Sequence, residues 1–530
     1  MRRLLLFSLS AFVIVGCGGG SGGVVDENSS SFKRQNRTIV IDDSSKIYKI
    51  RNAKSSQIEL DIKGVKDIYL VVTSRFNNQN ISISKDSTSF ENKEYRVLSS
   101  SFGDLNNTSS INTVLMRKEI NSILFTKKAP KVSQRVYSKQ KRLITKSARV
   151  STNFCVGMDS NYNCTGYVYA SAKKIVQDID TKYGKKSLVI WLEDGNSLSQ
   201  ASIDKLANIF LRSGANNDIY DWVTNIFGQE WGSDARSIDA KLIENSNIID
   251  ILIYNMNNMG LAGYYWGKDN FKKRSIAASN EKIMFYINSE LLKKDEKETY
   301  TTLTHEFQHM IHFYQRSVKM GIEDSAWYDE LMAESIEDLV STKIKYMGPR
   351  HVSPYDGTAG DSGNKGGRYP NFNRYNTASL TTWQNSAKDY SKVSAFGTYL
   401  LRNYGGAKLL NKMMYSQNQD EYAILDATGE KNFGELIANW GSAVLLSDII
   451  NVADKYTYNF GDFKYTSFGG VTYEMGSINF FNYTPKPQFR SSATLDKNAN
   501  LYYKVGSLMS GLHTINIDIP KGADITIIAK

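Results

Sequence analysis

Three of the five histidines in this 530-residue chain lie within eight positions, which limits how this stretch can fold. They are His305, His309 and His312, and Glu306 directly follows the first of them. In an α-helix, residues four positions apart lie on one face, about 6 Å apart along the axis. A helix would therefore let the imidazoles of His305 and His309 bind one metal ion, and the expected cofactor is one Zn²⁺ ion.

On such a helix Glu306 points in a different direction from His305, so it would not bind the metal at the same position. It would lie beside the metal, where a carboxylate can accept a proton from an attacking water. Gly321 follows the histidines as the expected C-terminal cap of the helix. The apolar run at residues 282–287 before the helix predicts an edge strand beside a cleft.

A catalytic zinc site needs a third protein ligand and one open position. Glu330 lies 21 positions after His309, within a run of apolar residues at helical spacing that begins at Trp327. This distance is enough for a turn and a returning antiparallel helix. The expected ligand set is therefore His305, His309 and Glu330.

This combination resembles the gluzincin metallopeptidases, whose zinc motif is His-Glu-x-x-His followed by a Glu in a W-x-x-E-type helix. Within that group the chain is similar to the hyicolysin family of bacterial secreted peptidases, with further matching residues at 279–288, 394–400 and 404–406. The resemblance covers roughly residues 150–450. It implies a zincin-like α+β catalytic domain, an endopeptidase activity on proteins or peptides, and Glu306 as the general base. The chain lacks the Gly-x-Met-Glu-Asn segment of the aminopeptidase branch.

The resemblance also implies a Tyr or His that stabilises the oxyanion. Tyr390 is the predicted residue, because it precedes an apolar helical pattern and could face the cleft. The other candidates are Tyr375, Tyr399 and His351. Tyr399 falls inside the apolar pattern, so packing in the core is its expected role.

In the gluzincin pattern, a carboxylate one turn after the ligand Glu orients a zinc-binding histidine through its other ring nitrogen. Glu334, four positions after Glu330, is the predicted residue, and Glu337 is its competitor. His312 is two turns from His305, about 10.5 Å along the helix. One ion is therefore not expected to bind all three histidines, and His312 is expected to line the cleft or face the surface.

The N-terminus has the pattern of an export signal. Arg2 and Arg3 precede an apolar stretch at 4–15, and Gly16-Cys17 then resembles a bacterial lipobox. The resemblance implies a lipoprotein signal peptide at 1–16, lipidation of Cys17 and a flexible tether at 17–30. We expect a lipid-anchored protein of the bacterial cell envelope, at the outer membrane or cell surface rather than the inner membrane.

The predicted export determines the expected oxidation state of the two remaining cysteines. Cys155 and Cys164 lie nine positions apart in a turn-rich stretch. Because exported proteins fold in an oxidising compartment, we expect a disulfide between them.

Changes of pattern along the chain predict the domains. Short alternating runs predict an N-terminal β domain at 31–126, and a return of this pattern predicts a C-terminal β module at 465–530. Between them, a connector at 127–150 precedes the catalytic domain at 151–464, where helices are expected at 170–182, 202–213 and 393–404. Residues 58–68 resemble 515–525, either because the two ends carry modules of one type or by chance.

The net charge of +11 comes from 65 basic and 54 acidic residues, and many of the basic ones lie in the connector. No nucleic-acid-binding motif accompanies them, so nucleic acid is not an expected partner. The alternative to an enzyme is a surface adhesin on a degenerate peptidase fold. The intact set of His305, Glu306, His309 and Glu330 favours the enzyme.

Overall fold

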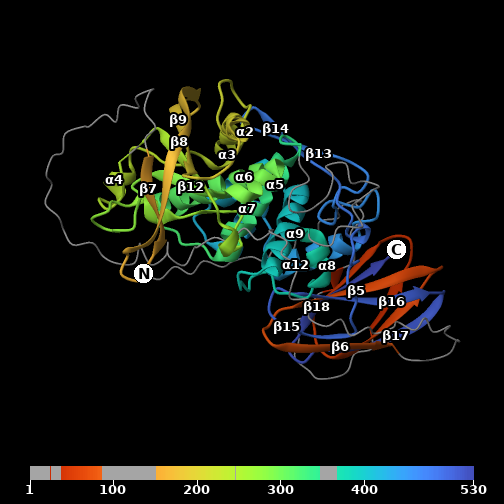
Figure 1. Ribbon diagram of the computed structural model, residues 1–530. Helices are drawn as coiled ribbons and strands as arrows, with labels where there is room; N and C mark the ends of the chain where they lie inside the picture. The colour runs from red at the N-terminus through yellow and green to blue at the C-terminus, as the bar shows by residue number, and fades with distance from the viewer. Residues whose placement is uncertain (1–23, 26–36, 86–150, 245, 346–366) are drawn as a thin grey trace, which may run out of the picture.

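The computed structural model describes residues 24–25, 37–85, 151–244, 246–345 and 367–530. Helices and a mixed sheet form one part of it, and a β-sandwich forms the other (Figure 1). An α+β fold was expected, and the mixture of helices and sheets agrees with it. The predicted signal peptide, Cys17, the connector at 127–150 and His351 lie outside the described residues.

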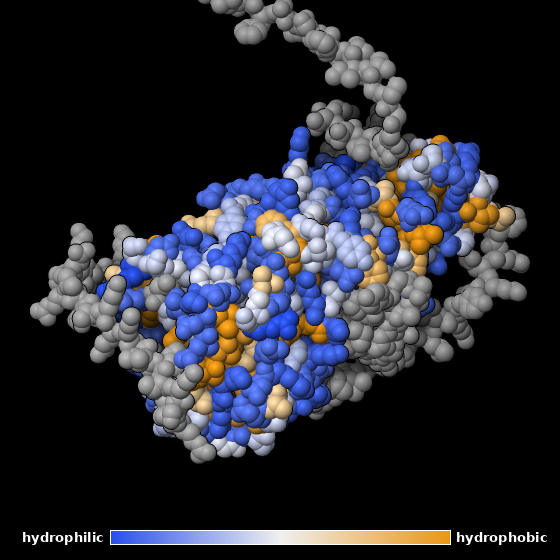
Figure 2. All heavy atoms as spheres, turned by 90° about the horizontal axis from the view of Figure 1, so that it is seen from above, coloured by the Kyte–Doolittle hydropathy of each residue, from blue (hydrophilic) through white to orange (hydrophobic). Residues whose placement is uncertain are grey.

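Among the described residues, no helix is long and apolar enough to cross a membrane. In the view of Figure 2, hydrophilic residues cover most of the visible surface, and smaller hydrophobic areas lie between them.

A six-stranded sheet forms the first layer of the mixed part, in the order β11-β12-β10-β9-β8-β7. Its strands are β7 (Ser151–Met158), β8 (Cys164–Thr181), β9 (Gly184–Glu193), β10 (Ile248–Tyr254), β11 (Gly263–Tyr265) and β12 (Ile283–Asn288). Strands β9, β10 and β12 are parallel, whereas β7, β8 and β11 run antiparallel to their neighbours. Leu188, Ile190 and Leu192 of β9 face the core that the helices share. Val189 and Trp191 face a second cluster on the other side.

The helix expected at 170–182 is wrong, because residues 170–181 belong to strand β8 and residue 182 lies in the turn that follows. The pairing of β8 with β9 shifts register between Ala172 and Lys174 and again between Val176 and Ile179. Such bulges interrupt the two-residue alternation of a strand. The apolar residues therefore recur at a spacing that resembles a helix.

The edge strand beside the zinc-motif helix also differs from expectation. Residues 283–288 form β12, which lies between β10 and the three-residue strand β11. The edge is therefore β11, which is too short to produce a recognisable sequence pattern.

The helices described in this part of the structure all follow β9 in the sequence. They are α2 (Gln200–Phe210), α3 (Ile219–Phe227), α4 (Ala235–Ile238), α5 (Ser289–Lys294), α6 (Glu296–His312), α7 (Ala326–Ser341), α8 (Arg368–Arg374), α9 (Ala387–Asn403), α10 (Ala407–Tyr415), α11 (Asp420–Thr428) and α12 (Phe433–Leu445). The helices expected at 202–213 and 393–404 correspond to α2 and α9, and both begin earlier than the apolar pattern indicates. A hairpin of β13 (Lys464–Phe468) and β14 (Val471–Met475) packs against α10 and α7.

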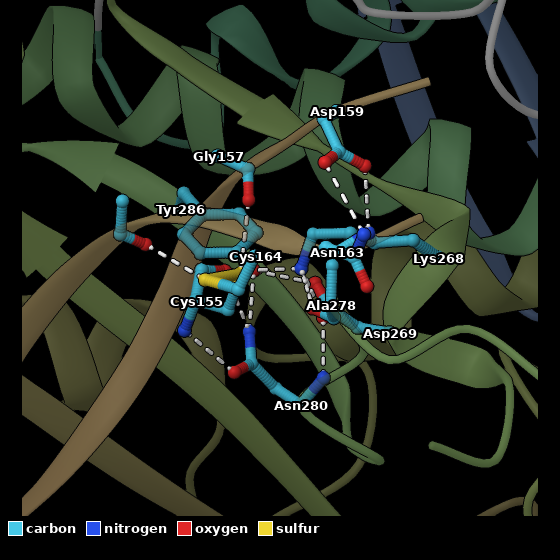
Figure 3. Close-up of a disulfide and its surroundings, with 11 residues drawn as sticks. Cys155, Gly157, Asp159, Asn163, Cys164, Lys268, Asp269, Ala278, Asn280 and Tyr286 are labelled. Carbon is cyan, nitrogen blue, oxygen red and sulfur yellow. Dashed lines mark hydrogen bonds and ion pairs between the residues drawn. A yellow bond between two sulfur atoms is a disulfide. The ribbon is translucent and has the colours of Figure 1, made fainter. Parts of the chain in front are cut away.

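A disulfide joins Cys155 of β7 to Cys164 at the start of β8. Figure 3 shows the polar residues around it. Asn280 accepts a hydrogen bond from the Cys155 amide at 2.8 Å, and the buried ammonium of Lys268 donates to the carbonyl oxygens of Cys155 and Ala278 at 3.0 Å each. These contacts fasten the loop before β12 to β7, and so fix the strand that leads into the zinc-motif helix.

The two ends of the chain form one β-sandwich, not two separate modules. One sheet has the order β1-β3-β18-β5-β16 and the other β15-β6-β17-β4-β2. Its strands are β1 (Val24–Val25), β2 (Arg37–Ile41), β3 (Ile47–Ala53), β4 (Ser56–Ile62), β5 (Lys66–Ser74), β6 (Gln79–Lys85), β15 (Ser492–Leu495), β16 (Asn500–Leu508), β17 (Gly511–Asp518) and β18 (Ala523–Ala529). The separate β domain expected at 31–126 and β module expected at 465–530 are therefore corrected: their described strands belong to one sandwich. Strand β18 lies between β3 and β5, and β17 lies between β4 and β6, so the two ends share one core.

The resembling segments at 58–68 and 515–525 are neighbours in this sandwich. Ile58 of β4 lies directly opposite Ile515 of β17, and β5 pairs with β18 in the other sheet. The two similar segments therefore occupy equivalent positions: each runs from a strand of one sheet to a strand of the other, and β4–β5 pairs with β17–β18.

The sandwich docks on helix α12. Arg51 of β3 pairs with Glu435 at 2.6 Å. Gly441 of α12 lies so close to β5 that an added Cβ would stand 2.6 Å from the Cγ1 atom of Val71. The absence of a side chain at Gly441 allows the helix to pack closely on the sheet.

Deletion of residues 491–530, which carry β15 to β18, should unfold strands β2 to β6 as well. The remaining strands would lose their partners within both sheets and expose a shared apolar core. Limited proteolysis would test this, with rapid cleavage expected within 37–85. A truncated chain that protects 37–85 as well as the full chain does would contradict the single sandwich.

Candidate metal centre

Helix α6 carries the His-Glu-x-x-His motif through the middle of the mixed part. It begins where the side chain of Asp295 accepts hydrogen bonds from the amides of Lys297 and Glu298, both at 3.0 Å. A π-helical segment, η3 (Phe313–Met320), continues the helix and ends at Gly321, which has a φ of 67°. Gly321 therefore caps the C-terminal end of this helical segment as expected, because the left-handed region favours glycine.

The two histidines of the motif meet on the buried face of α6. The ring centroids of His305 and His309 lie 4.6 Å apart, and their exposed fractions are 0% and 1%. Helix α7 returns along this face and places Glu330 against both rings. Its Oε2 atom is 3.1 Å from Nε2 of His305 and 3.5 Å from Nε2 of His309. The structure thus brings together the three predicted ligands.

The chemistry of this donor set fits a zinc ion. Ligand atoms of His305, His309 and Glu330 all lie within 4.8 Å of one another. Two imidazoles and one carboxylate are a usual protein contribution to a catalytic zinc site. No side chain among the described residues hydrogen-bonds to the carboxylate of buried Glu306, so both its oxygens are available for other partners.

The charges of the three residues depend on each other. Burial opposes ionisation of His309, but the carboxylates of Asp329 and Glu330 outweigh it and raise its pKa to about 9. Burial likewise opposes the charge on Glu330, and the two imidazoles reverse this effect and lower its pKa to about 2. A metal ion would have to displace protons from the histidines, so its binding should release protons.

Each ligand histidine has a carboxylate at its other ring nitrogen. Nδ1 of His305 lies 2.7 Å from Oε1 of Glu337, and Nδ1 of His309 lies 3.1 Å from Oδ1 of Asp329. At His305, the hydrogen bond to Glu337 holds the hydrogen on Nδ1 and leaves the lone pair of Nε2 for a metal. At His309, the charge of Asp329 at ion-pair distance favours a hydrogen on Nδ1 in the same way. Both rings are therefore oriented with Nε2 towards Glu330.

The prediction that Glu334 orients a histidine is wrong. Glu334 pairs instead with the buried guanidinium of Arg368, at 2.6 Å from Nη2. Glu334 and Glu337 lie one and two turns after Glu330 on nearly the same face of α7. Arg368 from α8 attracts the first of them and leaves Glu337 for His305.

The contact of Asp329 with a ligand histidine was not predicted from the sequence. The available signal was an acidic residue directly before the ligand Glu330, in a helix with many acidic residues. Only the position of α7 against α6 shows which of these side chains reaches a histidine.

Glu306 lies beside the histidines, on the turn of α6 that they share. Burial raises its pKa to about 7, and positive charge on His305 and His309 acts in the opposite direction. A buried carboxylate beside the two histidines is placed to accept a proton from a water in the site.

Tyr390 of α9 also reaches the cluster. Its hydroxyl donates to Oε1 of Glu330 at 3.3 Å, and the guanidinium of Arg368 lies 5.1 Å from its ring centroid. Tyr399 instead donates to the carbonyl of Lys455 in the core, and Tyr375 is 44% exposed. Of the described candidates for the oxyanion, only Tyr390 lies at the centre.

His312 lies on the far side of Asp329 from His309. Its Nδ1 is 3.1 Å from Oδ1 of Asp329, and its Nε2 is 2.9 Å from Asp324. The side chain is buried, so the expected position at the surface or in a cleft is wrong. It does not contact the ligand set directly.

A family model described as Peptidase M30 matches residues 170–529, which is more than half of the chain and includes the whole centre. The chain belongs to the peptidase M30 family. The M30 match runs from β8 to β18, so it includes the C-terminal strands of the sandwich but not the strands before residue 170.

One curated relative of this M30 chain is a neutral metalloprotease, ShpI of Staphylococcus hyicus. The two are 25% identical over 176 residues, which is 31% of this chain and 36% of the relative. The chain therefore matches about a third of the length of that protein. Both the M30 family and this relative support a metallopeptidase.

Proposed function

We propose that this protein is a zinc endopeptidase anchored by lipid in the bacterial cell envelope. The observation that carries the proposal is the buried set of His305, His309 and Glu330 around one point, with Glu306 beside it. Membership of the M30 family supports peptide hydrolysis as the reaction. When bound, zinc supplies Lewis-acid polarisation of the scissile carbonyl.

The residues of the chain perform the other steps. His305, His309 and Glu330 hold the ion, while Glu337 and Asp329 keep the two rings in position. Glu306 accepts the proton of the attacking water and passes it to the leaving amine. Tyr390 donates a hydrogen bond to the oxyanion that forms at the carbonyl.

Metal analysis combined with casein hydrolysis tests this proposal. We expect close to one zinc ion per chain, hydrolysis that a chelator abolishes, and recovery when zinc is restored. A purified protein that binds no zinc would refute the ligand assignment. Zinc binding without cleavage of casein or of a peptide library would refute the endopeptidase.

Tyr390→Phe should lower kcat by roughly 10²-fold to 10³-fold and leave KM and zinc content nearly unchanged, because it removes one oxyanion donor. Steady-state kinetics on a peptide substrate would measure the change. Tyr399→Phe is the matched control, because its hydroxyl bonds to the Lys455 carbonyl away from the centre. Equal kcat values for the two variants would remove Tyr390 from the mechanism.

Cys17→Ser should move the protein from the membrane fraction to the soluble fraction. The reason is that the lipid on Cys17 provides the proposed anchor, and without a lipid chain the protein would lose the signal that stable membrane attachment needs. Fractionation of cells expressing either form would measure the change. A variant that still sediments with membranes would contradict the lipid anchor.

A further inference from the structure

A chain of buried charged groups extends from the metal centre to the far end of α6. We call it the His312 network, and it consists of His309, Asp329, His312, Asp324 and Arg316. All five side chains are buried, with exposed fractions of at most 7%. The proposed ligand His309 is its first member.

The network is joined at Asp329. Its Oδ1 atom lies 3.1 Å from Nδ1 of His309 and also 3.1 Å from Nδ1 of His312. One carboxylate oxygen therefore lies within ion-pair distance of both imidazoles. His312 thus faces the same oxygen of Asp329 that faces His309.

His312 is itself held at its second nitrogen. Its Nε2 lies 2.9 Å from Oδ2 of Asp324, and Nη2 of Arg316 donates to the other oxygen of Asp324 at 2.8 Å. Burial opposes the charge on Asp324, but His312 and Arg316 outweigh it and lower its pKa to about 2. Asp324 is therefore a fixed anion, and the ring of His312 has little freedom to rotate.

Arg316 connects the network to the backbone at the end of α10. Its Nη1 donates to the carbonyl oxygens of Met414 and Ser416 at 3.1 and 2.8 Å, and its Nη2 donates to that of Asn418 at 2.7 Å. A cation at the C-terminal end of a helix is favourable. Arg316 thus attaches the outer end of the network to the backbone at the C-terminal end of α10.

We propose that His312 is a positioning residue for zinc, which holds Asp329 so that His309 keeps its Nε2 directed at Glu330. The inference rests on the proposed function, because it concerns the affinity of that site for zinc. His312 is not a ligand in this arrangement, since both its nitrogens face carboxylates. This gives the third histidine of the sequence motif a role that its spacing did not reveal.

The experiment compares three substitutions of His312 in the full chain. Phenylalanine keeps an aromatic ring beside Tyr328, whose centroid is 6.2 Å away, but it has no nitrogen. Asparagine places an amide nitrogen near the position of Nδ1, towards Asp329. Glutamine places one near Nε2, towards Asp324. The zinc dissociation constant is measured by competition with a chromogenic chelator, together with the melting temperature of each protein.

We expect His312→Phe to bind zinc about ten-fold more weakly than wild type or worse, and His312→Asn to recover to within about three-fold of wild type. His312→Gln should remain weak, because its amide does not support Asp329. A purely structural role would lower the melting temperatures without separating the zinc affinities of the asparagine and glutamine variants.

Equal zinc affinity in the phenylalanine and asparagine variants would overturn the inference. If His312→Phe does not fold, the other two decide: tighter zinc binding by asparagine than by glutamine supports the role, and any other order overturns it. A wild-type protein without zinc would refute the proposed function itself. Zinc binding by wild type with no difference among the variants would refute only the role of His312.

Discussion

Glu306→Gln should lower peptide hydrolysis by at least about 10²-fold while the protein keeps its zinc, because the amide cannot accept a proton from the attacking water. The carboxylate is buried beside His305 and His309, and no side chain among the described residues hydrogen-bonds to it. The amide has nearly the same volume, so the fold should tolerate it. The measurements are kcat on a peptide substrate, zinc content and melting temperature.

Glu296→Gln is the matched control for this variant. Glu296 lies in the first turn of the same helix and pairs with Lys205 on the surface at 3.0 Å. Its substitution should leave kcat and zinc content unchanged. Hydrolysis by Glu306→Gln within a few fold of wild type would mean that another group acts as the base.

Glu330→Gln should reduce the zinc content from about one ion per chain to almost none under conditions that saturate wild type. The carboxylate is the only anion in the ligand set, and it lies within 3.5 Å of Nε2 of both His305 and His309. A catalytic zinc site takes three protein ligands, so the substitution would leave only the two histidines to hold the metal. Metal analysis after gel filtration would measure the loss, and hydrolysis should disappear with it.

Glu334→Gln on the same helix should show the opposite pattern. It would remove the negative charge that forms a bidentate pair with the buried guanidinium of Arg368, which costs about 3–5 kcal/mol of unfolding free energy. Its zinc content should stay near that of wild type, because Glu337 rather than Glu334 contacts His305. If Glu334→Gln also lost its zinc at a temperature where it remains folded, the distinction between the two carboxylates would be wrong.

The ligand set could be predicted from the sequence because it depends on one helical period and one return. His305 and His309 are fixed relative to each other by the geometry of α6 alone. Glu330 needs only an antiparallel helix at the right distance. Local regularity of this kind is visible in a single sequence.

The choice between Glu334 and Glu337 could not be made in this way. Both lie on the face of α7 that Glu330 occupies, and the deciding group is Arg368, which begins another helix more than 30 positions later. The same limit applies to Asp329 and His312. Their contact depends on how closely α7 packs on α6, which spacing along one helix does not determine.

The fold shows the same difference between local and distant information. Alternating runs at both ends correctly indicated strands, but alternation does not reveal which strands pair. β4 and β17 are more than 400 residues apart in the sequence, yet they lie side by side. In β8, two bulges hid the alternation and produced the wrong prediction of a helix.

The sandwich of both chain ends has a consequence for biosynthesis. Because β18 lies between β3 and β5 in their sheet, strands β3 and β5 must wait for β18, made more than 400 residues later, before they can pair. Pairings at such high contact order form slowly and leave strand edges open in the meantime. A polypeptide whose translation stops before β15 would leave β3, β4 and β5 without these partners.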